Sequence, residues 1–242
     1  MTGTKPRRGF SARARRVREH CALALISAAL LAVMLAFVHS KDIIYRLSMA
    51  TAYASLALLV VALLIGPLNV LRGRPNPVST NLRRDIAIWG GAVAVGHVII
   101  GLQVHLRGHM IEYFVDPKRG GPRIDRFGLA NYTGLVAGLV FVMLLALSND
   151  LSLRSLGTPR WKALQRWNYV AMGLTVIHGV LFQTLEKRAL AFVFVFGIQV
   201  LIALGFQLAG YRRYSAVSVG RRASRSRRLL HDVEDEGREQ AL

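Results

Sequence analysis

Six long apolar runs, separated by charged segments, constrain the fold of this 242-residue chain more than any other feature. A helix needs about 20 apolar residues to cross roughly 30 Å of hydrocarbon. Six stretches meet this length, and the rest of the chain leaves no room for a seventh. They lie near residues 21–39, 47–71, 86–106, 129–148, 168–185 and 189–210. The sequence therefore predicts an all-α integral membrane protein folded as a six-helix bundle.

The basic residues predict the orientation of this bundle. Lys and Arg number 32 against 13 Asp and Glu, a formal net charge of +19. In a soluble protein this charge favours nucleic-acid binding, but here the basic residues cluster beside the apolar runs, where the positive-inside rule places them in the cytoplasm. We therefore expect no nucleic-acid partner, cytoplasmic termini and a multi-pass protein of a lipid bilayer such as a bacterial inner membrane. The segment 107–128 fits least well, because it should lie outside yet carries five basic residues against three acidic ones.

Composition divides the chain into three parts. Residues 1–19 form a basic cytoplasmic N-terminus, and the apolar run after them is too long for a typical signal peptide, so we interpret it as an uncleaved first span. Residues 20–211 form the six-span membrane domain. Residues 212–242 carry opposite blocks of charge and few aromatic residues, which predicts a cytoplasmic tail that is disordered or lies on the anionic inner leaflet.

Two histidines lie inside the predicted spans, where an ionisable side chain is costly and indicates a functional site. His97 comes 12 residues after Asp85, the charge at the inner edge of the third span, and His178 comes 12 residues after Arg166, at the inner edge of the fifth. At 1.5 Å per residue each lies about 18 Å from its inner edge, slightly beyond the midplane. Two imidazoles at one depth on parallel helices can face each other, as ligation of a haem by two histidines requires.

A simpler explanation of the two histidines is also open, in which each makes an ordinary interhelical hydrogen bond. Cysteine chemistry does not compete with either explanation. Cys21 is the one cysteine in the sequence, so it cannot form an intramolecular disulfide or build a Cys-based zinc or iron–sulfur site.

Two longer patterns surround the histidines. One is the segment 81–89 (NLRRDIAIW) followed by His97, and the other is the segments 148–157 (SNDLSLRSLG) and 161–166 (WKALQR) followed by His178. In order and spacing they resemble the third helix, the fourth-to-fifth loop and the fifth helix of the ferric reductase-like transmembrane domain family. The resemblance covers roughly residues 47–210.

The resemblance implies a b-type haem core that moves electrons across the bilayer, with His97 as the third-helix ligand of the outer haem and His178 as its fifth-helix partner. Members with two haems carry another histidine 13 residues before the fifth-helix ligand, where this chain has Gln165, and the matching third-helix position is Arg83. One haem b is therefore expected. The large oxidases of the family also carry a fused flavin and nicotinamide domain, which is not found here. The chain is thus more similar to the short, MsrQ-type members, which rely on a separate electron donor.

Four other residues are secondary candidates. His105 and His109 are predicted on one helix face at the outer end of the third span, where they could be alternative ligands, a metal-ion site or a docking point, or simply solvated interfacial side chains. Arg107 and Arg126 are expected on the outer side, where they could pair with haem propionates or stay solvated.

These patterns favour an oxidoreductase component that takes electrons at the inner face from a separate flavoprotein or quinol and passes them to an outer acceptor protein or metal ion. Iron held by two histidines has no open position for substrate, so the protein would position the haem and tune its potential. An autonomous metalloreductase would in addition need an outer metal site. A haem-free transporter or scaffold would use the histidines for proton relay or helix packing, although the broken helices and repeated halves of many transporters are not evident.

Overall fold

The computed structural model describes the backbone of residues 8–74 and 81–239, and these segments are helical, with no β-sheet. A short 3-10 helix, η1 (Met110–Tyr113), lies in the connection between α3 and α4. The α-helices are α1 (Arg8–Phe37), α2 (Ile43–Leu71), α3 (Asn81–Gly101), α4 (Arg126–Leu147), α5 (Asp150–Gln165), α6 (Trp167–Leu185) and α7 (Leu190–Glu239). The predicted all-α class is confirmed.

Five helices in the described part of the chain are long and apolar enough to cross a membrane, namely α1, α2, α3, α4 and α7. The predicted fifth run corresponds to α6, which has 19 residues. At 1.5 Å per residue α6 is about 28 Å long, but it carries the polar residues Asn168, His178 and Gln183 and is not among the five. The fold is therefore an all-α membrane bundle.

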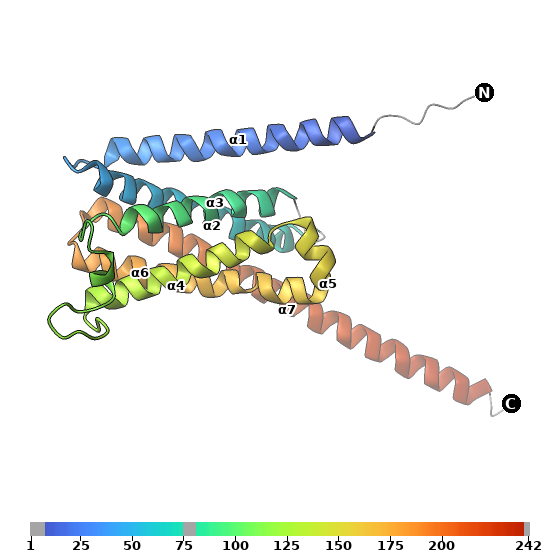
Figure 1. Cartoon of the computed structure of the whole chain (residues 1–242). Coiled ribbons are helices and arrows are strands. Elements are labelled where there is room, and N and C mark those ends of the chain that lie inside the picture. The colour runs from blue at the N-terminus through green and yellow to red at the C-terminus, as the bar shows by residue number, and fades with distance from the viewer. Residues whose placement is uncertain (1–7, 75–80, 240–242) are drawn as a thin grey trace, which may run out of the picture.

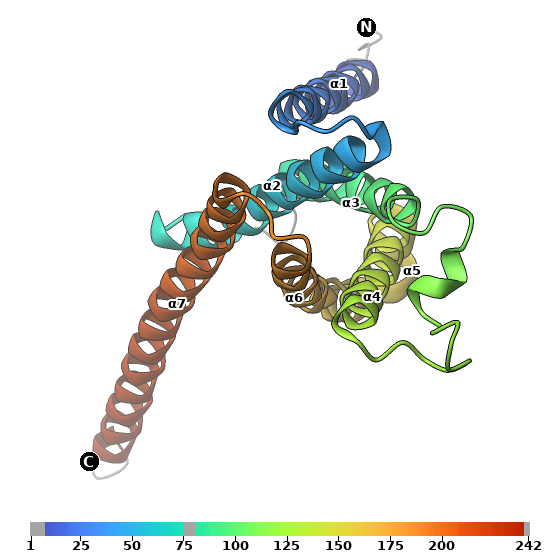
Figure 2. The same cartoon turned by 90° about the vertical axis from the view of Figure 1, so that its left-hand side faces the viewer.

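The helices run side by side, and α2 lies at the centre of one half of the bundle (Figure 1). It packs against α1, α3 and α7, whereas α4 packs against α3, α5 and α6. Half of the apolar stretch of α2 is buried within the protein, against 6% of that of α7. A helix that is apolar on all sides must be buried in protein or in lipid. The view along the bundle shows α7 leaning away from α4 and α6 (Figure 2). Many apolar side chains of α7 are therefore exposed on the surface of the bundle.

The two ends of the bundle differ in charge. The start of α1, the start of α3 and α5 lie at one end, beyond which the far part of α7 projects, and the connection 102–125 lies at the other end (Figure 1). At this second end three of the five basic residues of segment 107–128 pair with carboxylates, which offsets the charge that fitted the predicted topology least well. The pairs are Arg107–Asp42, Arg119–Asp116 and Arg123–Asp125.

The end of α3 differs from the sequence-based prediction. The third apolar run continues to residue 106, but α3 ends at Gly101. After it, the backbone N–H groups of Gln103 and Val104 bond three residues back in turns. The hydroxyl of buried Tyr113 then accepts the backbone N–H groups of His105 and Leu106, at 2.9 and 3.0 Å. These contacts hold the chain in a compact connection in place of another helical turn.

The charged segments at 149–166 and 212–239, predicted as a connection between spans and as a tail that is disordered or lies on the inner leaflet, are helical in the structure, with a kink at Gly157. The side chain of Asn149 caps α5, and the indole N–H of Trp161 donates to the carbonyl of Leu147 at 2.9 Å, which holds α5 against the end of α4. Further along, α7 continues to Glu239. Extending an existing helix avoids the nucleation cost, and Arg, Leu and Glu are good helix formers.

Candidate functional site

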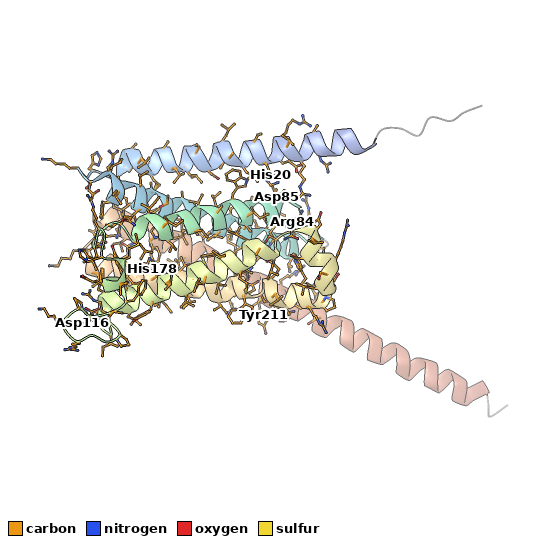
Figure 3. All side chains as sticks on the ribbon, in the orientation of Figure 1. His20, Arg84, Asp85, Asp116, His178 and Tyr211 are labelled. Carbon is orange, nitrogen blue, oxygen red and sulfur yellow. The ribbon has the colours of Figure 1, made fainter. Side chains whose placement is uncertain are left out.

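The two histidines predicted to lie at one depth meet inside the bundle. His97 comes from the last turns of α3 and His178 from the middle of α6, and their ring centroids are 6.1 Å apart with the ring planes at 76°. Figure 3 labels His178 within the bundle. The expected equal depth is thus confirmed by the contact between the rings.

Each imidazole is oriented by a backbone carbonyl of a neighbouring helix. Nδ1 of His97 lies 3.0 Å from the carbonyl oxygen of Ser48 in α2, and Nδ1 of His178 lies 2.8 Å from that of Ala130 in α4. The hydroxyl of Thr51 is a second, longer contact of His97, at 3.3 Å from Nδ1. Because a carbonyl can only accept, each Nδ1 must carry the proton, and the neutral ring keeps its lone pair on Nε2. Both Nε2 atoms are therefore free to ligate a metal.

The Nε2 atoms have no hydrogen-bond partner among the described residues. Both rings line a cavity between α2, α3, α4, α6 and α7, whose walls include the apolar side chains of Leu59, Ala94 and Phe141.

Glycine makes the close approach of α4 to His178 possible. A Cβ atom on Gly134 would lie 2.5 Å from Nδ1 of His178, so any side chain there would displace the imidazole. One turn further along α4, a Cβ on Gly138 would lie 2.9 Å from a methyl group of Val98. Small residues at these positions let α4 pack tightly on α3 and α6 around the cavity.

A charged cluster closes the cavity at the end near the connection 102–125. Nε2 of His105 lies 2.9 Å from a carboxylate oxygen of Glu186, whose other oxygen lies 2.9 Å from the guanidinium of Arg188. The guanidinium also lies over the ring of Tyr45, with 5.9 Å between its carbon and the ring centroid. All four residues line the cavity. Burial acts to raise the pKa of Glu186, but the hydrogen bond with His105 and the charge of Arg188 outweigh it and lower the pKa.

Arg188 has spare hydrogen-bonding capacity. Its side chain is 13% exposed, and its Nη1 atom is buried with no hydrogen-bond partner among the described residues. This Nη1 atom could therefore donate to an anionic group in the cavity. Sequence reasoning missed Arg188 because it follows the last turn of α6 directly and resembles an ordinary charge at the end of a span.

The secondary candidates occupy different places from those predicted. Since α3 ends at Gly101, His105 and His109 do not share a helix face, and that prediction is wrong. Both histidines are exposed, but His105 lines the cavity and stacks on Phe182, whereas His109 pairs with Glu112 at 3.2 Å.

The two candidate arginines also lie away from the cavity walls. Arg107 pairs with Asp42, and Arg126 is exposed at the start of α4. The arginine that lines the cavity is Arg188.

The histidine pair does not by itself form a complete site for a bare metal ion. In the described part of the chain no group of three or more His, Cys, Asp and Glu residues is placed to hold one. The resemblance would place the ligands of a second haem at Gln165 and Arg83. Gln165 has a buried amide nitrogen without a partner among the described residues, and Arg83 is half-buried. Neither supplies an imidazole.

Comparison of the chain with protein-family models, with curated proteins and with solved structures finds no match. The resemblance to the ferric reductase-like family therefore rests on the sequence patterns around His97 and His178 and stays a prediction.

Proposed function

We propose that this chain is a haem b membrane protein that carries electrons between the two faces of the bilayer, with His97 and His178 as the two axial ligands. The observation that supports this most directly is the pair of Nδ1 contacts to the carbonyls of Ser48 and Ala130. Metal-bound histidines typically donate their second N–H to such a partner, which fixes the tautomer and the ring orientation. Here both rings have this arrangement and share one cavity.

The spacing of the rings supports the same assignment. If each Nε2 atom lay about 2.0 Å from a shared metal, as is typical of imidazole, the ring centroids would be about 6.3 Å apart. The centroids of His97 and His178 are 6.1 Å apart. Two imidazoles leave the remaining coordination positions to the ligand itself, which favours a macrocycle over a free ion.

The cavity fits such a macrocycle in its chemistry. Apolar side chains line the walls around the histidine pair, and Arg188 at one end has a free donor for a carboxylate. A haem carries two propionates, so Arg188 and Tyr45 would be the residues that pair with these carboxylates. When bound, haem supplies a one-electron redox centre. The residues of the chain orient the ligands, exclude water and pair with the carboxylates.

Aromatic contacts suggest where electrons leave. Phe182 contacts both His178 and His105. Its ring centroid lies 4.9 Å from that of His178 and 6.1 Å from that of His105. His105 in turn contacts Glu186 near the surface. This contiguous row favours an acceptor, either a protein or a metal ion, at the end formed by the connection 102–125.

The proposal includes a topology of six spans, with α6 as the span that is not among the five long apolar helices. Because α6 is packed against α4 and lines the cavity, its polar residues can face protein in place of lipid. The basic end, which holds the start of α1 and from which the far part of α7 projects, is then cytoplasmic. A separate electron donor, a flavoprotein or a quinol, would act at that end, in a cell membrane such as a bacterial inner membrane.

The test is the absorbance of the purified chain before and after reduction with dithionite. We expect the spectrum of a low-spin b-type haem at one haem per chain. His97→Ala and His178→Ala should each lose it, whereas His109→Ala, at an exposed histidine, should keep it. A chain purified without haem, or two alanine variants with unchanged haem, would contradict the proposal and favour a haem-free transporter or scaffold.

A further inference from the structure

One side of the cavity around the histidine pair is closed differently from the others. Three sides are closed by helix packing, since α2 packs on α3, α3 on α4 and α4 on α6. The remaining side lies between α2 and α6, and along their described lengths the backbones of these two helices do not come within packing distance of each other. This side is covered by α7, which packs along α2 and leans away from α6 (Figure 2).

Phe196 fills the gap between α2 and α6, and it is the one described residue of α7 that lines the cavity. On the α6 side its ring lies against Gly179, where an added Cβ atom would be 2.5 Å from Cε2 of Phe196. On the α2 side it packs against the apolar clusters that contain Tyr53 and Leu56. A single aromatic ring therefore closes this side of the cavity.

Side-chain contacts bound the gap on either side of this ring. Toward the connection 102–125, the hydroxyl of Tyr53 accepts the amide N–H of Gln183 at 2.8 Å and donates to the carbonyl of Phe192 at 3.0 Å. Toward the basic end, Met172 of α6 packs against the apolar cluster that contains Leu56 of α2. Because Gln183 and Met172 are 11 residues apart, the gap is about 16 Å long along α6.

The outer surface beside Phe196 is apolar and exposed on both helices. The exposed side chains are those of Phe194 and Ile198 on α7 and of Ile177 and Val180 on α6. In a membrane, exposed apolar side chains of this kind contact the hydrocarbon. A ligand dissolved in the bilayer would thus have one side chain to displace before it reaches the cavity.

Entry from the aqueous end would disturb more interactions. There the charged cluster of His105, Glu186 and Arg188 closes the cavity, so a ligand would have to part a hydrogen bond and an ion pair. Displacing the ring of Phe196 breaks no hydrogen bond. The ring can also move by rotation about two side-chain bonds, without movement of its helix.

We propose that the gap between α2 and α6 is a lateral entry site, through which a flat apolar macrocycle passes from the bilayer into the cavity, with Phe196 as its gate. A flat ring that enters edge first needs a long, narrow opening with apolar borders, as this gap provides. Carboxylates on such a ring stay at the level of the headgroups, since burying them in hydrocarbon is costly, and Arg188 lies at the corresponding end of the cavity. The identity of the macrocycle as haem rests on the proposed function.

The test measures the rates at which a porphyrin enters and leaves the cavity. The full chain, prepared without haem in phosphatidylcholine nanodiscs, is mixed with protoporphyrin IX, which carries no metal and needs no axial ligand. Uptake is followed by the saturable quenching of tryptophan fluorescence, and release by transfer to an excess of apomyoglobin. Phe196→Ala should raise both rates several-fold and in the same proportion, because removing a gate lowers the barrier in both directions. Phe196→Leu, which keeps more of the packing, should give a smaller increase in both rates.

Phe141→Ala is the matched control, because Phe141 lines the cavity from α4, which does not border the gap. It should raise the release rate alone, as expected when a wall contact is lost. Glu186→Gln weakens the aqueous closure and should speed uptake less than Phe196→Ala does. The proposal is overturned if Phe196→Ala raises only the release rate, if Phe141→Ala speeds uptake equally, or if Glu186→Gln has the larger effect on uptake.

Haem binding by the same variants separates the two proposals. Uptake of protoporphyrin that depends on Phe196, in a chain that forms no low-spin haem, refutes the proposed function alone. Low-spin haem in a chain whose uptake does not depend on Phe196 refutes the lateral entry site alone. A chain that takes up neither porphyrin refutes both.

Discussion

Replacing Gly134 by alanine tests whether the orientation of His178 governs cofactor binding. The added Cβ atom would lie 2.5 Å from Nδ1 and 2.7 Å from Cε1 of His178. Neither atom is the end of a flexible chain, because the imidazole is held by the carbonyl of Ala130 at 2.8 Å. The ring must therefore move, and its Nε2 atom moves with it.

The expected size of the effect follows from the two interactions that change. Overpacking of a buried site costs about 1–3 kcal/mol, and the loss of the buried hydrogen bond that Nδ1–H donates adds about 1–3 kcal/mol. Disturbing the partner that orients a ligating histidine lowers ligand affinity by about ten- to a hundredfold. We expect Gly134→Ala to lower haem affinity within that range.

Two other glycines provide controls for the assay, which compares haem-to-protein ratio and the rate of haem loss to an excess of apomyoglobin. At Gly173 in α6 a Cβ atom meets nothing within 4 Å, so Gly173→Ala should keep the haem and gain up to about 1 kcal/mol of helix stability. At Gly138 the Cβ would meet Val98 but no imidazole. Gly138→Ala should therefore lower the free energy of unfolding while lowering haem affinity less than Gly134→Ala does.

The reasoning is refuted if Gly134→Ala retains haem as tightly as the unmodified chain. It is also refuted if Gly138→Ala loses haem to the same extent, because general destabilisation would then explain the loss.

Three further predictions concern the charged cluster and the connection 102–125. Arg188→Gln should lower haem affinity several-fold, because the Nη1 atom of Arg188 is expected to hold a propionate, whereas Arg126→Gln should leave the haem-to-protein ratio unchanged. The pKa of Glu186 is lowered in the folded protein, so the stability that its charged form contributes is complete above its unfolded pKa of about 4.3 and is lost as pH falls through the folded value. Thermal unfolding measured against pH should show this loss of stability. In Glu186→Gln this pH dependence should be absent. Tyr113→Phe should cost about 1–3 kcal/mol, because the backbone N–H of His105 loses its acceptor, and unchanged hydrogen exchange of that amide would contradict this.

Much of the fold could be predicted because its signals are local. Apolar runs of span length and basic flanks depend on neighbouring residues along the chain, so the all-α class and the apolar helices followed from the sequence. The shared depth of His97 and His178 also followed, because a helix rises by a constant amount per residue and both counts start from a charge at the inner edge. The ends of helices followed less well, since α3 stops at Gly101 through contacts with the distant Tyr113.

The chemistry of the site depended on the tertiary structure. The sequence could indicate two histidines at one depth, but not which ring nitrogen is free, because that is decided by the carbonyls of Ser48 and Ala130, each more than 45 residues away along the chain. It also could not choose between Arg107, Arg126 and Arg188, since all three lie at the same end of the bundle. Only the packing of α2, α4 and α6 decides which guanidinium reaches the cavity, because a burial pattern is set by helices that meet in space and not by residues adjacent in sequence.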